Sequence, residues 1–138
     1  MQTQIIDASL PPVFLADSEA DILADLALAV RERSPLAADF LLREIDRAST
    51  TSPAELPRDV VTMMSCVDFI DEGSGELHSV QLVYPKDADT DRHCISVLTP
   101  IGAALIGMPR GASIDWPNRA GEYRRLRILE VTQPDVQS

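Results

Sequence analysis

The sequence predicts an α+β fold, in which a short N-terminal helical hairpin precedes an antiparallel β-sheet domain that carries one short helix. Two observations support this prediction. Residues 18–48 contain two apolar stripes of helical period, separated by a Ser-Pro pair. Residues 60–132 contain short apolar runs of strand character, interrupted by one compact apolar segment. Helices and strands that are segregated along the chain, rather than alternating, are typical of α+β proteins.

The hairpin is expected within residues 1–52. An extended segment at Val13 to Leu15 leads into a first helix that is predicted to start at Ser18, where a capping box begins, and to end near Arg33. The expected apolar stripe of this helix is Ile22, Leu23, Leu26, Ala27 and Val30. Because the connection at Ser34 is so short, the two helices must run antiparallel, and at ~1.5 Å per residue each is about 20–24 Å long.

The second helix is predicted to open at Pro35, with Ser34 as its cap, and to end near Ala48. A polar loop is expected over residues 49–53. The β-rich domain is then assigned to residues 53–138. Its predicted strands cover residues 60–69, 79–84, 95–97, 113–116 and 123–132. The in–out pattern of the last strand slips between Ile128 and Leu129, which predicts a β-bulge.

The short helix lies in the stretch Ile101 to Pro117, which organises the domain. Thr99 is a good N-cap, and a proline at the first helical position costs no hydrogen bond. A glycine after the last apolar residue can adopt the left-handed cap that ends a helix. We interpret five residues of this stretch as structural, because they set a cap, close packing and turns: Pro100, Gly102, Leu105, Gly107 and Gly111.

These residues also support a resemblance to a known family. The stretch SVLTPIGAALIGMPRGASIDWP resembles the signature of the carboxy-terminal domain of the GreA/GreB transcription elongation factors. The match extends upstream through DVVTMMSCVDFID and LVYPKDAD, and the segments EIDRASTTSPAELP and DVVTM resemble the Rnk type ("regulator of nucleoside diphosphate kinase") more than Gre proper. The resemblance implies an FKBP-like fold for residues 53–138, with a coiled-coil hairpin beside it.

The resemblance also implies a partner, bacterial RNA polymerase. Gre factors insert a long coiled-coil arm into the polymerase secondary channel, where two acidic residues at the tip help to hold a catalytic Mg²⁺ ion. Here the arm is shorter and the Asp-x-x-Glu pair is missing from the tip. The resemblance therefore implies a regulator that docks at the secondary channel and competes with Gre factors without stimulating transcript cleavage. The candidate contact residues at the tip are Arg31, Glu32, Arg33 and Asp39.

Alternatives remain open for these residues. Glu32 and Asp39 could act as a Gre-like metal-binding pair in cleavage, or could be solvated helix-end charges. A stand-alone interaction module with another partner is a third possibility. A basic face formed by five arginines could dock onto an acidic rim of the polymerase channel, or could be a solvated strand face. The five are Arg110, Arg119, Arg124, Arg125 and Arg127.

Composition and motifs disfavour several other classes. A net charge of −10 opposes sequence-independent DNA binding, and we expect no direct sequence-specific DNA binding either. No run approaches the ~18 apolar residues of a membrane helix, and no signal-peptide pattern is seen, so we expect a cytoplasmic protein without a membrane partner. We expect free thiols at Cys66 and Cys94, which with His78 and His93 match no zinc spacing. Without a phosphate loop or an aromatic proline pocket, we expect no cofactor and no enzyme activity, prolyl isomerisation included.

Overall fold

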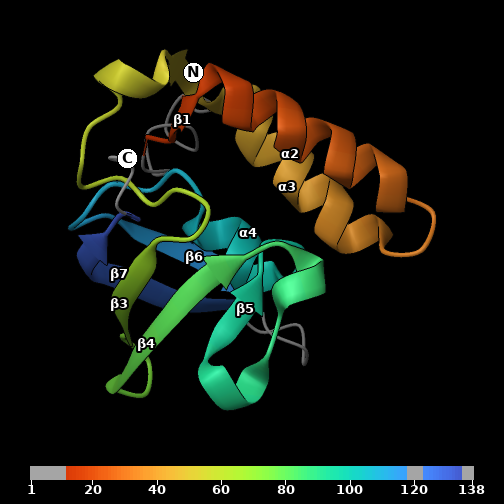
Figure 1. Cartoon of the computed structure of the whole chain (residues 1–138). Helices are drawn as coiled ribbons and strands as arrows, with labels where there is room; N and C mark the ends of the chain where they lie inside the picture. Colours follow the sequence, from red (N-terminus) through yellow and green to blue (C-terminus); the bar gives the residue numbers. More distant parts are fainter. Residues whose placement is uncertain (1–11, 118–122, 135–138) are drawn as a thin grey trace, which may run out of the picture.

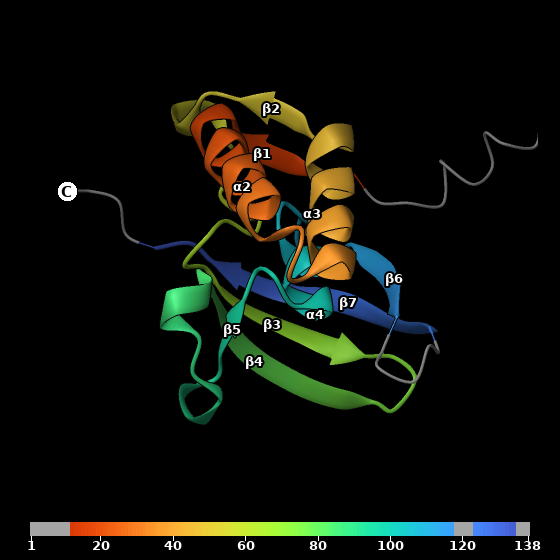
Figure 2. The ribbon, with the colours of Figure 1, turned by 90° about the vertical axis from the view of Figure 1, so that its right-hand side faces the viewer.

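The computed structural model describes residues 12–117 and 123–134, with backbone only for residues 116, 117, 123 and 124. Two helices, α2 (Asp17–Val30) and α3 (Pro35–Arg47), lie side by side over a five-stranded sheet (Figure 1). The short helix α4 (Pro100–Leu105) lies between this hairpin and the sheet, as Figure 2 shows. The α+β prediction is therefore confirmed. None of the helices in the described ranges is long and apolar enough to span a membrane.

The main sheet has the strand order β5-β4-β3-β7-β6. Its strands are β3 (Cys66–Asp71), β4 (Glu76–Val83), β5 (Cys94–Ser96), β6 (Ser113–Pro117) and β7 (Tyr123–Thr132). Three of the four pairings are antiparallel, but β4 and β5 are parallel, so the prediction of a purely antiparallel sheet was wrong. The reason is the polar segment after β4, whose two 3-10 turns, η2 (Pro85–Asp87) and η3 (Thr90–Arg92), return the chain to the start of its neighbour.

A second, two-stranded sheet joins the two ends of the hairpin. Strand β1 (Phe14–Ala16) pairs in parallel with β2 (Ser49–Thr51). The extended segment before the first helix is thereby confirmed, whereas the loop expected at residues 49–53 contains a strand and then the 3-10 turn η1 (Pro53–Glu55). The backbone N–H of Phe14 also donates to the carbonyl of Gly107, which ties β1 to the sheet domain.

The first helix differs from the prediction at both ends. It starts directly after Ala16, so Ser18 lies inside the first turn and caps nothing, and it ends at Val30 rather than near Arg33. Ile22 is 52% exposed, so its place in the apolar stripe was wrong. The reason is helical geometry, because a spacing of three or four residues selects one narrow stripe and Ile22 falls beside it. The buried residues of this stripe are Ala20, Leu23, Ala27 and Val30.

The first predicted strand of the sheet domain was too long. Strand β3 begins only at Cys66, because Met64 has a left-handed φ of 70° that interrupts the extended backbone before it. At the other end of the domain, the predicted strand 123–132 and its bulge are confirmed. Asp68 faces Glu130 and Phe69 faces Ile128, which leaves Leu129 as the extra residue.

The local chemistry of α4 is as predicted. The Thr99 hydroxyl accepts a hydrogen bond from the Gly102 N–H at 3.0 Å and so caps the helix. A Cβ on Gly102 would lie 2.1 Å from the carbonyl oxygen of Ser96, which confirms the close packing contact. Gly107 has the left-handed φ of 77° expected of a residue that ends a helix.

The apolar core is continuous from the hairpin to the sheet. One cluster of buried side chains includes Leu23 and Leu41 of the hairpin, Leu105 of α4, and Val67 and Ile128 of the sheet. Because this core is shared, the tip of the hairpin is held in a defined place relative to the sheet. This rigidity positions the surfaces described next.

Candidate interaction surfaces

The hairpin tip consists of residues 31–36. The backbone N–H groups of Arg33 and Ser34 both donate to the carbonyl of Val30, which closes the end of α2 and reverses the chain. Across the turn, the Arg31 Nε donates to Asp39 Oδ1 at 3.0 Å, and both side chains are about half exposed. The spacing of eight residues places one partner at the end of α2 and the other in the first turns of α3.

The remaining tip residues include one acid that is unpaired among the described residues and one exposed apolar side chain. Within the described ranges, Glu32 has no ion-pair partner, whereas the Asp39 carboxylate is occupied by Arg31. A hard divalent cation needs converging free carboxylates. Leu36 is 86% exposed, and sequence reasoning missed it. The sequence pattern indicates this exposure, because Leu36 directly follows Ser-Pro and lies outside the apolar stripe that α3 buries.

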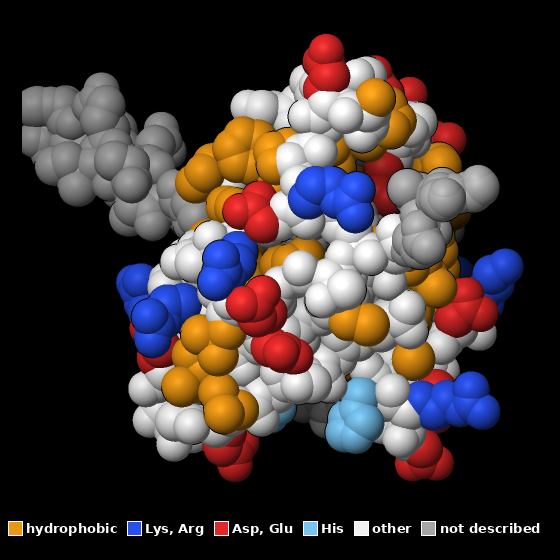
Figure 3. Space-filling view, turned by 60° about the vertical axis from the view of Figure 1, so that its left-hand side comes forward, with side chains coloured by type: hydrophobic (Ala, Val, Ile, Leu, Met, Phe, Trp, Pro, Cys, Tyr) orange, Lys and Arg blue, Asp and Glu red, His pale blue; other side chains and the backbone are white. Residues whose placement is uncertain are grey.

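The arginines of the sheet domain lie beside carboxylates. Arg110 Nη2 lies 3.3 Å from Glu130 Oε2, Arg125 Nε lies 3.1 Å from Asp115 Oδ1, and Arg127 Nε lies 3.0 Å from Glu72 Oε2. Arg125 and Arg127 share one face of β7, because alternate residues of a strand point the same way. The space-filling view in Figure 3 shows basic and acidic side chains intermixed over one side of the molecule.

The surroundings of two of the five predicted arginine side chains are not defined. Arg119 lies outside the described residues, and Arg124 is described only by its backbone in β7. The three described arginines form exposed ion pairs, which contribute little to stability in water.

The residues of the short-helix signature are mostly inaccessible. Gly102, Leu105 and Gly107 are buried, whereas Pro100 and Gly111 are exposed. Each has a local structural task, since Pro100 opens α4 and Gly111 has a left-handed φ of 88° at a turn. This signature therefore shapes the domain and offers little surface to a ligand.

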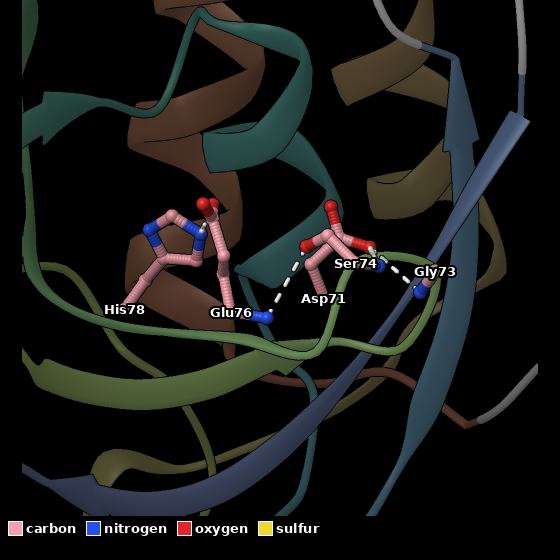
Figure 4. Close-up of polar contacts among 5 residues, drawn as sticks. All are labelled: Asp71, Gly73, Ser74, Glu76 and His78. Carbon is pink, nitrogen blue, oxygen red and sulfur yellow. Dashed lines mark hydrogen bonds and ion pairs between the residues drawn. The ribbon is translucent and has the colours of Figure 1, made fainter.

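The turn that connects β3 and β4 contains acidic residues and lies near His78, and its contacts are structural. Asp71 Oδ1 accepts hydrogen bonds from the backbone N–H groups of Gly73 at 2.9 Å and Ser74 at 3.4 Å, as Figure 4 shows. Beside it, the His78 ring stacks on Phe69 with centroids 5.1 Å apart. Among residues 12–117 and 123–134, no three His, Cys, Asp or Glu side chains are grouped so that they could hold a metal ion.

Glu19, which sequence reasoning did not single out, lies where α2 meets the sheet domain. Its two carboxylate oxygens accept from the Met63 N–H at 3.3 and 3.4 Å. Burial raises the pKa of Glu19, and this hydrogen bond offsets part of the rise. Burial, together with the negative charge of Glu19, also raises the pKa of Tyr84. Acids in the first turn of a helix are expected for the dipole alone, so the sequence gives no signal of this contact.

This carboxylate predicts a pH dependence of stability. Because its folded-state pKa lies above the ordinary value of 4.5, the folded chain holds the proton more tightly than the unfolded chain. The contribution of Glu19 is therefore fully present below that value and is lost as the pH rises through the folded pKa. We expect Glu19→Gln to match the wild type near pH 4 and to be the more stable protein at pH 7, as measured by urea unfolding.

Asp21→Asn is the matched control for the pH experiment, because Asp21 is an exposed acid on the same helix. It removes the same charge from the same helix without touching the contact with Met63, so a pH-dependent difference between the two variants reports on the Glu19 site. A Glu19→Gln variant that is no more stable than the wild type at pH 7 would contradict the assignment.

Comparison with known proteins identifies the class. Residues 56–133 match the family model "Transcription elongation factor, GreA/GreB, C-term". Together with the hairpin-on-sheet architecture, this match defines the class: the chain belongs to the GreA/GreB family. The family resemblance found in the sequence is thus confirmed.

Two of three similar proteins match over nearly the whole chain, and the third matches over two thirds of it. The chain is 39% identical over 130 residues to the "Regulator of nucleoside diphosphate kinase" of Escherichia coli K12, covering 93% of this chain and 95% of that protein. It is 34% identical over 93 residues to the transcription elongation factor GreA of Prosthecochloris aestuarii, covering 66% and 58% of the two chains. A solved GreA/GreB elongation factor from Nitrosomonas europaea is 41% identical, with a TM-score of 0.70, covering 89% of this chain and 99% of that one.

Proposed function

We propose that this chain is a transcription elongation regulator of the Rnk type, which binds bacterial RNA polymerase at its secondary channel and competes with Gre factors. The similarity to a regulator of nucleoside diphosphate kinase over nearly the full length of both chains supports the Rnk type. The observation that carries the absence of cleavage stimulation is the tip, where the Asp39 carboxylate is bound to Arg31 at 3.0 Å. To bind a metal ion, Asp39 would have to give up this ion pair, and Glu32 is the acid at the tip that is unpaired among the described residues.

In this proposal each part of the molecule has one task. The sheet domain, with its FKBP-like fold, docks at the channel mouth through the arginine face. The hairpin acts as a short coiled coil that points inward, with Arg31, Glu32 and Arg33 at its tip and Asp39 next to the tip in α3. Since α2 has 14 residues at ~1.5 Å each, the arm reaches only about 20 Å. The chain then obstructs the channel without supplying a catalytic group, so it is not itself an enzyme.

A competition assay on backtracked polymerase tests this function. We expect transcript cleavage stimulated by a Gre factor to fall as the chain is added, and no cleavage by the chain alone. Arg31→Ala, which removes a tip cation, should weaken the competition about tenfold, equivalent to ~1.4 kcal/mol of binding free energy. Because the Arg31–Asp39 pair is exposed, the same substitution should cost less than ~1 kcal/mol of stability.

Arg43→Ala is the matched control, because Arg43 is exposed in the middle of α3, away from the tip. It should compete like the wild type. Cleavage that rises with the chain alone and disappears in Glu32→Ala would instead establish the Gre-like mechanism with Glu32 and Asp39. A chain that fails to bind core polymerase in a pull-down would point to an interaction module with another partner.

A further inference from the structure

A groove of about 780 Å³ opens between the hairpin tip and the sheet domain. One wall comes from α2 and the tip, with Leu26, Val30, Arg33 and Ser34, and the other comes from the segments that follow β4 and β5, with Tyr84, Pro85, Lys86 and Leu98. The eight lining residues extend from Leu26 to Leu98, a separation of 72 positions in the sequence, and the shared core brings them together. The groove is thus a product of the packing of the hairpin on the sheet.

The charge of the groove is opposite to that of the molecule. The chain has a net charge of −10, yet the lining contains two cations, Arg33 and Lys86, and no carboxylate. Within the described ranges, neither cation has an ion-pair partner, whereas Arg110, Arg125 and Arg127 each have one. Glu19, the carboxylate that acts on Tyr84, is hydrogen-bonded to Met63 and is not a lining residue. The groove therefore favours a negatively charged ligand.

The rest of the lining is apolar or aromatic. Leu26, Val30 and Leu98 supply aliphatic surface, and Tyr84 adds an aromatic side chain to the lining. Small-ligand sites are concave and mostly apolar, with a few converging polar groups and volumes of about 300–1,000 Å³. The groove has this composition and this size.

We propose that this groove binds a small organic anion, with an apolar, ring-sized body on Tyr84 and the aliphatic side chains and a carboxylate or phosphate group at Arg33 and Lys86. The ligand bridges the hairpin and the sheet domain, since each contributes one of the two cations. This site lies beyond the proposed polymerase function and does not depend on it. The charged end and the apolar body are both required, because exposed cations alone bind anions only weakly.

The test is a ¹H–¹⁵N NMR titration with 2-naphthoate, with 1-naphthyl phosphate as a second arm and neutral 2-naphthalenemethanol as the control ligand. We expect saturable binding of at least one anion, with shifts concentrated at the amides of Leu26, Val30, Ser34, Lys86 and Leu98. The stronger arm identifies the carboxylate or the phosphate as the preferred group. The neutral alcohol should bind at least about tenfold more weakly than that anion.

Charge variants make the test specific. The double variant Arg33→Gln/Lys86→Gln should weaken binding of the anion by at least about tenfold, ~1.4 kcal/mol. The matched double variant Arg43→Gln/Arg58→Gln makes the same change of charge at exposed residues outside the groove and should bind like the wild type. Far-ultraviolet circular dichroism of both variants verifies that they are folded.

Three results would overturn the proposal. The first is no saturable binding of either anion at ~1 mM, a concentration that corresponds to a binding free energy of about −4 kcal/mol. The second is equal binding of the neutral alcohol, and the third is equal binding of the anion by the Arg33→Gln/Lys86→Gln variant.

A partner protein could instead occupy the groove. Lys86 is the only lysine in the chain, so acetylation of this side chain reports directly on access. Protection of Lys86 by core polymerase, with no binding of either anion, would assign the groove to a protein interface.

Discussion

Gly102→Ala is expected to lower the free energy of unfolding by about 2–3 kcal/mol, although alanine is the better helix former by ~1 kcal/mol. The new Cβ would lie 2.1 Å from the Ser96 carbonyl oxygen and 2.9 Å from its carbon. This carbonyl cannot move away freely, because it accepts hydrogen bonds from the Thr99 N–H at 3.1 Å and the Thr99 hydroxyl at 2.7 Å. Overpacking against fixed backbone therefore outweighs helix propensity.

Urea unfolding of Gly102→Ala and of a control glycine variant measures this effect. Gly75→Ala is a suitable control, because nothing lies within 4 Å of its added Cβ, while its φ of 80° is unfavourable for alanine. Its cost is backbone strain without overpacking, about 1 kcal/mol, whereas Gly102 has no left-handed φ and its cost comes from overpacking. A Gly102→Ala protein as stable as the wild type would show that α4 can shift away from Ser96, contrary to the packing described above.

Leu41→Ala is expected to cost about 2–5 kcal/mol and to destabilise the hairpin and the sheet together. Leu41 is fully buried, and it belongs to the single core that also contains residues of α4 and the sheet. Truncation leaves a cavity in a shared core rather than in an isolated hairpin. We therefore expect one cooperative transition, shifted to lower urea concentration as a whole.

Two probes separate the parts of the molecule in this experiment. Circular dichroism at the helix band follows α2 and α3, and the fluorescence of Trp116, the only tryptophan, follows strand β6. The two transitions should coincide in the wild type and in the variant. Leu36→Ala makes the same substitution at an 86% exposed position and should change stability by less than ~0.5 kcal/mol. A helix signal that moves alone would mean that the hairpin unfolds separately.

The parts of the fold that the sequence predicted well are those fixed by neighbouring residues. Thr99, Pro100 and Gly107 define α4 because capping, proline placement and the left-handed end are local. The bulge at Leu129 was visible because a period of two that slips by one residue has one physical explanation. The hairpin and the sheet domain followed from the helical and strand periods, and the family resemblance supported them.

The parts of the fold and of the candidate site that could not be predicted depend on contacts between segments that are distant in the sequence. The parallel pairing of β4 with β5 is set by the path of the intervening segment, and the short pairing of β1 with β2 is set by the length of the hairpin. Similarly, Arg127 meets Glu72 and Arg125 meets Asp115 only after β7 has entered the sheet. The groove joins residues from Leu26 to Leu98, so neither its shape nor its charge has a local signature.

Gly107 has a mechanical consequence. Its carbonyl accepts from the Phe14 N–H, and its own N–H donates to the Val61 carbonyl, both at 2.8 Å, so one residue fastens the strand before α2 to the sheet domain. An added Cβ there would lie 2.5 Å from Val13. These contacts fix the orientation of the hairpin relative to the sheet domain. On the proposed docking, the orientation of the bound sheet domain therefore sets the direction in which the tip points. A substitution at Gly107 would change this direction without altering either contact surface.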